Sequence, residues 1–129
     1  MHRRIWLAIA AIGLAVAGCG GGGDDTAAIE TVATEFQFAP AVWNVPEGAE
    51  VTLTLGNQGT EDHEWALLSG EIESEAAFTE DLVIWEIEAA PGESVEGTFT
   101  APAAGSYQVV CVIPGHFDSG MEGVLTVGG

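Results

Sequence analysis

Residue types that bind soft metal ions are scarce in this chain and unevenly placed. Beyond residue 18 there are two histidines, one methionine and two cysteines. Three of these five residues lie in the segment Cys111-Val-Ile-Pro-Gly-His116-Phe-Asp-Ser-Gly-Met121. A thiolate and two imidazoles form the trigonal His2Cys plane of a mononuclear copper site, and a thioether supplies its weak axial ligand. We therefore predict a single copper ion bound by His63, Cys111, His116 and Met121.

The same four ligands suit a metal that changes its oxidation state. Soft sulfur favours Cu(I), whereas imidazole binds both Cu(I) and Cu(II). Gly115 and Gly120 allow tight turns, and Pro114 restricts the backbone just before His116. Phe117 either fills the loop or contributes to an apolar docking surface. A site held this rigidly has little to reorganise when it gains or loses one electron.

Simpler explanations exist for each residue taken alone. A cysteine that ends an apolar strand is often a buried structural thiol, and a methionine often fills a gap in a core. Zinc would need a stronger fourth ligand than methionine. Binuclear copper, multicopper oxidase, nitrite reductase and hydrolase chemistry all need further cysteines or histidines, so we predict no enzyme. A copper-capture or delivery protein that does not cycle its metal remains an alternative, as does a metal-free binding module.

The elements that must position these ligands are β-strands. From Ile29 onward, apolar and polar residues alternate mostly with period two, and Pro and Gly separate the alternating stretches. This pattern is typical of an all-β antiparallel sandwich of seven to eight strands. Glu71 to Asp81 could instead hold a helical turn, and Trp43, Trp65 and Trp85 are expected in the core. The predicted strands cover residues 31–38, 42–45, 51–55, 65–68, 82–87, 94–99, 107–112 and 123–127.

The start of the chain has the features of an export signal. The apolar stretch Ile5 to Val16 follows two arginines and is too short to span a bilayer. It leads into Val16-Ala-Gly-Cys19, which resembles a bacterial lipobox and predicts a signal peptide over 1–18 and lipidation of Cys19. An ordinary signal peptide with Cys19 as a free thiol is the alternative. Residues 19–28 are expected to be a flexible linker and 29–129 the folded domain. The predicted location is the bacterial cell envelope, with the chain lipid-anchored on the periplasmic or extracellular side of a membrane.

The charge is strongly one-sided. Both basic residues, Arg3 and Arg4, lie in the predicted signal peptide, so the rest of the chain has no cation to set against 20 acidic residues. Nucleic acid and anionic lipid surfaces are therefore poor partners, since binding them depends on cationic side chains, and we predict no nucleic-acid partner. The acidity indicates either adaptation to high salt or attraction of a basic redox partner, such as a cationic cytochrome or an oxidase. A monomer is expected. One group of acids is either a solvated loop or a docking patch: Glu71, Glu73, Glu75, Glu80 and Asp81.

The order His…Cys-x4-His-x4-Met resembles the cupredoxins, the blue type 1 copper proteins. Tyr107-Gln-Val-Val-Cys111 before the loop and Gly123-Val-Leu-Thr-Val127 after it fit the same family, as does Asn57-Gln-Gly-Thr-Glu-Asp-His63 upstream. The resemblance covers roughly residues 30–127, and the spacing around His116 is most similar to that of rusticyanin- and sulfocyanin-like members. It implies a Greek-key β-sandwich and transfer of single electrons. It also implies that His116 is the ligand nearest the surface and the route of the electron.

One residue departs from the family pattern. Many relatives have a small polar residue after the first histidine, whereas this chain has Glu64. A carboxylate facing the metal would favour Cu(II) and lower the reduction potential. A carboxylate facing solvent would leave only the Glu64 backbone amide near the site, as a hydrogen-bond donor to the Cys111 sulfur. Asn57 is a further candidate for a supporting role beside the ligands.

Overall fold

The computed structural model describes residues 25–129. The predicted signal peptide and Cys19 lie outside this range, and no helix within it is long and apolar enough to cross a membrane. The first strand begins at Thr26. Residues 26–28, which we assigned to the linker, are therefore part of the folded domain.

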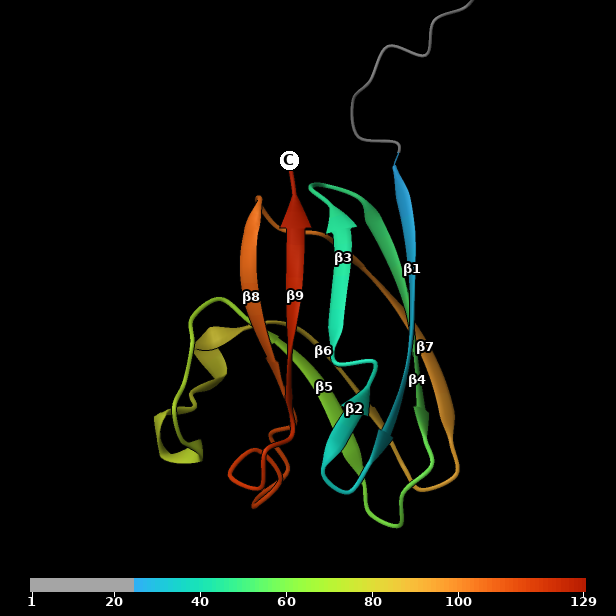
Figure 1. The fold of residues 1–129 in the computed structure, drawn as a ribbon, viewed down its shortest axis with the longest axis vertical. Coiled ribbons are helices and arrows are strands. Elements are labelled where there is room, and N and C mark those ends of the chain that lie inside the picture. Colours follow the sequence, from blue (N-terminus) through green and yellow to red (C-terminus); the bar gives the residue numbers. More distant parts are fainter. Residues whose placement is uncertain (1–24) are drawn as a thin grey trace, which may run out of the picture.

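Nine strands in two facing sheets form a sandwich (Figure 1). One sheet has the order β2-β1-β4-β7 and the other the order β3-β9-β8-β5-β6. Two short 3-10 helices, η1 (Glu75–Ala77) and η2 (Glu80–Leu82), lie in the long connection between β5 and β6. The strands are β1 (Thr26–Thr34), β2 (Gln37–Ala39), β3 (Val42–Pro46), β4 (Glu50–Asn57), β5 (His63–Leu68), β6 (Val83–Ala89), β7 (Ser94–Thr100), β8 (Gly105–Val110) and β9 (Glu122–Gly128).

The predicted all-β Greek-key sandwich is confirmed, with one strand more than the upper expected number. The extra strand arises because the predicted strand over 31–38 is interrupted by a turn at Glu35 and Phe36, which separates β1 from β2. Most pairs are antiparallel, but β1 pairs with β4 and β3 with β9 in parallel. The chain crosses to the other sheet at β3 before it returns, so β4 runs in the same direction as β1.

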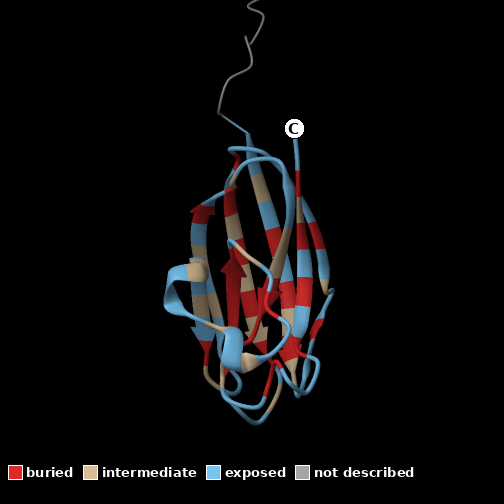
Figure 2. Ribbon diagram, turned by 90° about the vertical axis from the view of Figure 1, so that its left-hand side faces the viewer, coloured by how far each residue is buried: buried red, intermediate tan, exposed pale blue. Residues whose placement is uncertain are grey.

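The core lies between the sheets and follows the period-two pattern, so buried residues alternate with half-buried or exposed ones along the strands (Figure 2). In β4, Val51, Leu53 and Leu55 are fully buried and alternate with half-buried residues. Trp65 packs edge-to-face against Trp43 and Trp85, with ring centroids 5.5 and 6.0 Å apart. The three tryptophans thus contribute to the core as predicted, and burial of their large apolar area is a major source of stability.

Several connections meet at one end of the sandwich (Figure 1). They include the β1–β2 turn, the β4–β5 loop, the β6–β7 turn and the loop from β8 to β9. The start of β1 and the C-terminus lie at the opposite end. Strands held by the core therefore bring loops from distant parts of the sequence to a single end.

Candidate metal centre

Three of the four predicted ligands converge at this end. His63 is the first residue of β5, Cys111 directly follows β8, and His116 lies in the loop before β9. The Cys111 sulfur and one nitrogen of each imidazole all lie within 4.8 Å of one another. All three side chains are buried. Residues 48 positions apart in sequence, from His63 to Cys111, are thus held in one small water-excluded volume.

The loop from Cys111 to Met121 is closed by its own backbone. The nitrogen of Cys111 donates to the carbonyl of Met121 at 3.2 Å, and the nitrogen of Met121 donates to the carbonyl of His116 at 3.1 Å. Gly115 and Gly120 have φ angles of 87° and 98°, which side chains with a Cβ rarely adopt. Met121 is fully buried in the same core cluster as Cys111. Met121, the fourth predicted ligand, is thus buried and joined to Cys111 through the backbone.

The Cys111 sulfur lies next to two polar groups in the buried site. It accepts a hydrogen bond from the backbone nitrogen of Glu64 at 3.3 Å and lies 3.4 Å from His116 Nδ1. Burial raises the pKa of the thiol to about 11. The thiol is therefore protonated at neutral pH, and a metal ion has to displace that proton.

His63 has one ring nitrogen that no other group of the described chain satisfies. Its Nδ1 is buried and has no hydrogen-bond partner within residues 25–129. An unpaired polar atom in a protein interior is costly and uncommon. Its other nitrogen, Nε2, lies 3.2 Å from Glu35 Oε1. The donor set of two imidazole nitrogens and one thiol sulfur fits copper.

Glu35 belongs to the site, although its sequence position gave no sign of this. Its Oε1 accepts hydrogen bonds from the backbone nitrogens of Thr60 at 2.6 Å and Glu61 at 2.9 Å. These bonds hold the pKa of the carboxyl down at about 2. A Cβ at Gly59 would overlap this carboxylate, so the close approach requires glycine. Glu35 thereby fixes the loop that precedes His63 as well as the ring itself.

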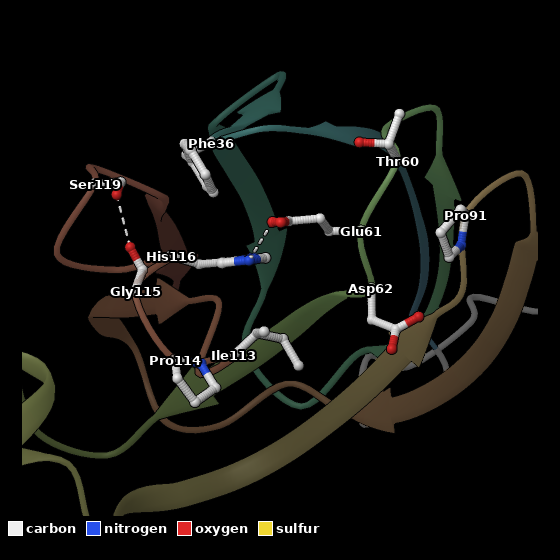
Figure 3. Close-up of a pocket in the computed structure, with 10 residues that line it drawn as sticks. All are labelled: Phe36, Thr60, Glu61, Asp62, Pro91, Ile113, Pro114, Gly115, His116 and Ser119. Carbon is white, nitrogen blue, oxygen red and sulfur yellow. Dashed lines mark hydrogen bonds and ion pairs between the residues drawn. The ribbon is translucent and has the colours of Figure 1, made fainter.

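His116 lies under the floor of a surface pocket (Figure 3). Its side chain is 5% exposed, whereas that of His63 is completely buried. The Nε2 atom lies 2.9 Å from Glu61 Oε2, and the ring of Phe36 packs edge-on against the imidazole with centroids 5.0 Å apart. His116 is thus the ligand nearest to solvent, with Glu61 over its outer nitrogen.

The Glu64 side chain points away from the metal centre. Successive residues of a strand face opposite sides, so Glu64 lies on the outer face of β5, opposite Glu88 of β6. It is nonetheless buried, and burial together with the neighbouring Glu86 raises the pKa of its carboxyl to about 8. Of the two arrangements considered from sequence, the structure has the one in which only the backbone amide reaches the sulfur.

The other supporting candidates have distinct contacts. Asn57 donates to the carbonyls of Glu61 at 2.7 Å and Ala89 at 2.8 Å, which ties the β4–β5 loop to the end of β6. Phe117 packs in a second apolar cluster on the outer face of β5 and β8, so it fills the loop instead of forming a docking surface. Pro114 lines the pocket beside His116 (Figure 3).

Comparison with known proteins agrees with this geometry. Residues 26–128 match the copper binding proteins of the plastocyanin/azurin family. The chain belongs to this family. Copper is accordingly its cofactor, and His63, Cys111 and His116 form the candidate type 1 site.

Among curated members of the family, auracyanin-A of Chloroflexus aurantiacus is 34% identical over 126 residues, which cover 83% of this chain and 76% of the relative. Auracyanin-B of the same organism is 29% identical over 121 residues, covering 79% of this chain. The chain spans only about half of auracyanin-B, 52% of its length.

Solved structures show the same fold. The reduced auracyanin of Roseiflexus castenholzii superposes with a TM-score of 0.70 at 28% identity, over 83% of this chain and all of that one. Rusticyanin from Thiobacillus ferrooxidans, a relative expected from the loop spacing, has a TM-score of 0.64 at 22% identity and covers 84% of this chain and 79% of its own. At that level of identity, the likeness to rusticyanin concerns the fold alone.

Proposed function

We propose that this protein is a mononuclear type 1 copper protein that transfers single electrons between redox partners of the bacterial cell envelope. The observation that carries the proposal is the buried cluster of His63, Cys111 and His116, in which the ligand atoms lie within 4.8 Å and His63 Nδ1 has no protein partner in the described chain. Met121 is the proposed axial ligand. Bound copper supplies the Cu(I)/Cu(II) couple that accepts and releases the electron.

The protein's contribution is to hold its ligands still. The backbone bonds within the 111–121 loop, the packing of Phe117 and the bond from Glu64 to the Cys111 sulfur all restrain the site. Burial excludes water from the ligand atoms. A preorganised site of this kind would change little on oxidation or reduction, which suits an electron carrier.

The surface around His116 suits a basic partner. Phe36, Pro91 and Ile113 provide apolar contacts in the pocket, and Glu61 provides negative charge beside His116 (Figure 3). The acidic loop 71–81 lies close by, because Asp118 of the ligand loop bonds with the backbone nitrogen of Glu75 at 3.1 Å. Since no Lys or Arg occurs after Arg4, opposite charges would attract a cationic cytochrome or oxidase. The signal-like start of the chain supports export and a lipid anchor at Cys19.

The test is to load the metal-free protein with Cu(II) and follow visible absorption. We expect an intense blue colour that a reductant removes and an oxidant restores. Cys111→Ser should remove the colour, whereas Cys19→Ser, which changes the cysteine outside the site, should retain it. A colourless and readily exchanged Cu(I) complex would instead indicate copper capture or delivery. Failure to bind copper would leave a metal-free binding module.

A further inference from the structure

Each ligand imidazole has a carboxylate against its outer nitrogen. His63 Nε2 lies 3.2 Å from Glu35, and His116 Nε2 lies 2.9 Å from Glu61. When Nδ1 of a histidine faces a metal ion, Nε2 carries the hydrogen and donates it. Both carboxylates therefore accept from a ligand, and in a chain without Lys or Arg after Arg4 no stronger cationic side chain competes for them.

The two carboxylates are held very differently. Glu35 is fixed by backbone nitrogens of the 59–62 loop, and its side chain is 26% exposed. Glu61 is 54% exposed, and within residues 25–129 its carboxylate bonds only to His116. The loop that carries Glu61 is itself anchored by Asn57 and by Glu35. The Glu61 carboxylate is thus exposed to solvent, is carried by an anchored loop and contacts His116 Nε2.

We propose that Glu61 is a positioning residue that fixes the ring and the tautomer of His116 and lowers the reduction potential of the centre. This inference rests on the proposed copper-carrier function. The bond to Nε2 directs the Nδ1 lone pair inward, toward the Cys111 sulfur 3.4 Å away. Phe36 limits rotation of the same ring from another side, as Figure 3 shows.

The direction of the effect follows from charge and basicity. An imidazole that donates to a carboxylate is a more basic ligand, and partners of this kind typically change metal affinity by about 10–100-fold. The negative charge at Glu61 also stabilises the more positive state of the centre. Both contributions favour the oxidised form over the reduced form. Because Glu61 covers the ring edge nearest to solvent, the residue acts at the place where an electron would leave.

The matched control is Asp62, the next residue. It lines the same pocket and carries the same charge, but it makes no hydrogen bond to either imidazole within the described chain (Figure 3). Glu61→Gln and Asp62→Asn therefore remove equal charge from nearly the same place. Only the first disturbs a bond to a ligand. Any difference between the two variants reports on that bond.

The experiment uses the full-length protein. In copper-loaded samples, voltammetry should show a higher reduction potential for Glu61→Gln than for Asp62→Asn, and Cu(II) affinity should fall about tenfold in Glu61→Gln alone. In metal-free samples, nitrogen NMR should show His116 with its proton on Nε2 in the wild type and in Asp62→Asn, and a mixture of tautomers in Glu61→Gln. Equal behaviour of the two variants in all three measurements would overturn the proposal. A wild type that is not blue would instead contradict the proposed function, and the NMR comparison would still test the positioning role.

Discussion

The backbone nitrogen of Glu64 donates to the sulfur of Cys111 at 3.3 Å, while the Glu64 carboxyl is buried on the opposite face of the same strand. The residue therefore serves the site through its main chain. Its side chain destabilises the folded state when it is charged, because one carboxyl oxygen has no hydrogen-bond partner within residues 25–129 and other glutamates surround it.

The buried Glu64 carboxyl should make the stability of the metal-free protein fall as the pH rises. The folded state raises the pKa of Glu64 from 4.5 to about 8, so it binds this proton more tightly than the unfolded state does. The associated stability is present below pH 4.5 and is lost as the pH rises toward 8. We expect Glu64→Gln to stabilise the metal-free protein at the upper end of this range by about 1–3 kcal/mol relative to the wild type, with little gain at the lower end. Urea unfolding followed by tryptophan fluorescence measures this. Glu96→Gln, at an exposed position on β7, should show no such trend, and parallel pH profiles for Glu64→Gln and the wild type would contradict the prediction.

Glu35 predicts the opposite trend in acid. Its pKa is lowered from 4.5 to about 2 by backbone hydrogen bonds, so its contribution is present above pH 4.5 and disappears as the pH falls toward 2. The Glu35→Gln variant should therefore be less stable than the wild type near neutral pH. In acid, the stabilities of the two proteins should become similar. Gly59→Ala should have a similar effect, because the added methyl displaces the carboxylate. Thermal unfolding of the metal-free variants is the measurement. A Glu35→Gln protein as stable as the wild type at neutral pH would show that the carboxylate does not hold the loop.

Metal loading should release a proton from Cys111. The thiol has a pKa of about 11 in the buried site, and a metal ion binds the deprotonated form. Cu(II) added to the metal-free protein in weak buffer at neutral pH should therefore release one proton for each ion bound. Calorimetry in buffers of different ionisation enthalpy counts these protons. Cys111→Ser should lose this release, and its persistence in that variant would assign the proton to another group.

Ionic strength should strongly affect stability. The chain has 20 acidic side chains and a formal charge of −18, and after Arg4 it has no cation to pair with them. Repulsion between like charges destabilises a compact state, and salt screens it over about 10 Å at 0.1 M. The melting temperature of the metal-free protein should rise as sodium chloride is added, whereas a neutral osmolyte gives no comparable dependence on ionic strength. A melting temperature that is independent of sodium chloride would show that the acids are too far apart to interact.

The three residues of the candidate site could be predicted because their types are rare in this chain. His63 and His116 are the only histidines after the signal-like segment, and Cys111 is the only cysteine after Cys19, so residue type alone singles them out. Met121 stays a predicted ligand. Alternation was equally informative for β4, where every second side chain is buried. Alternation also continued through Glu35 and Phe36, and for that reason it concealed the turn that places Phe36 against His116.

The carboxylates at the site could not be found in this way. Glu35 and Glu61 are two of 20 acids, and nothing local distinguishes them from solvated residues. Their roles depend on the β4–β5 loop lying beside the β1–β2 turn, which tertiary packing decides. The orientation of Glu64 likewise depends on the register of β5 against β6. Long-range placement, more than residue type, sets the surroundings of the ligands.

The start of β1 and the ligand loop lie at opposite ends of the sandwich (Figure 1). A lipid tether joined ahead of Thr26 would therefore leave the His116 end directed away from the bilayer. Since residues 25–129 present one such end, an electron donor and an electron acceptor of the proposed carrier would have to occupy the same surface in turn. We expect double-reciprocal plots of the electron-transfer rate to give parallel lines when the concentrations of donor and acceptor are both varied. This is the pattern of a carrier that must dissociate from one partner before it binds the other.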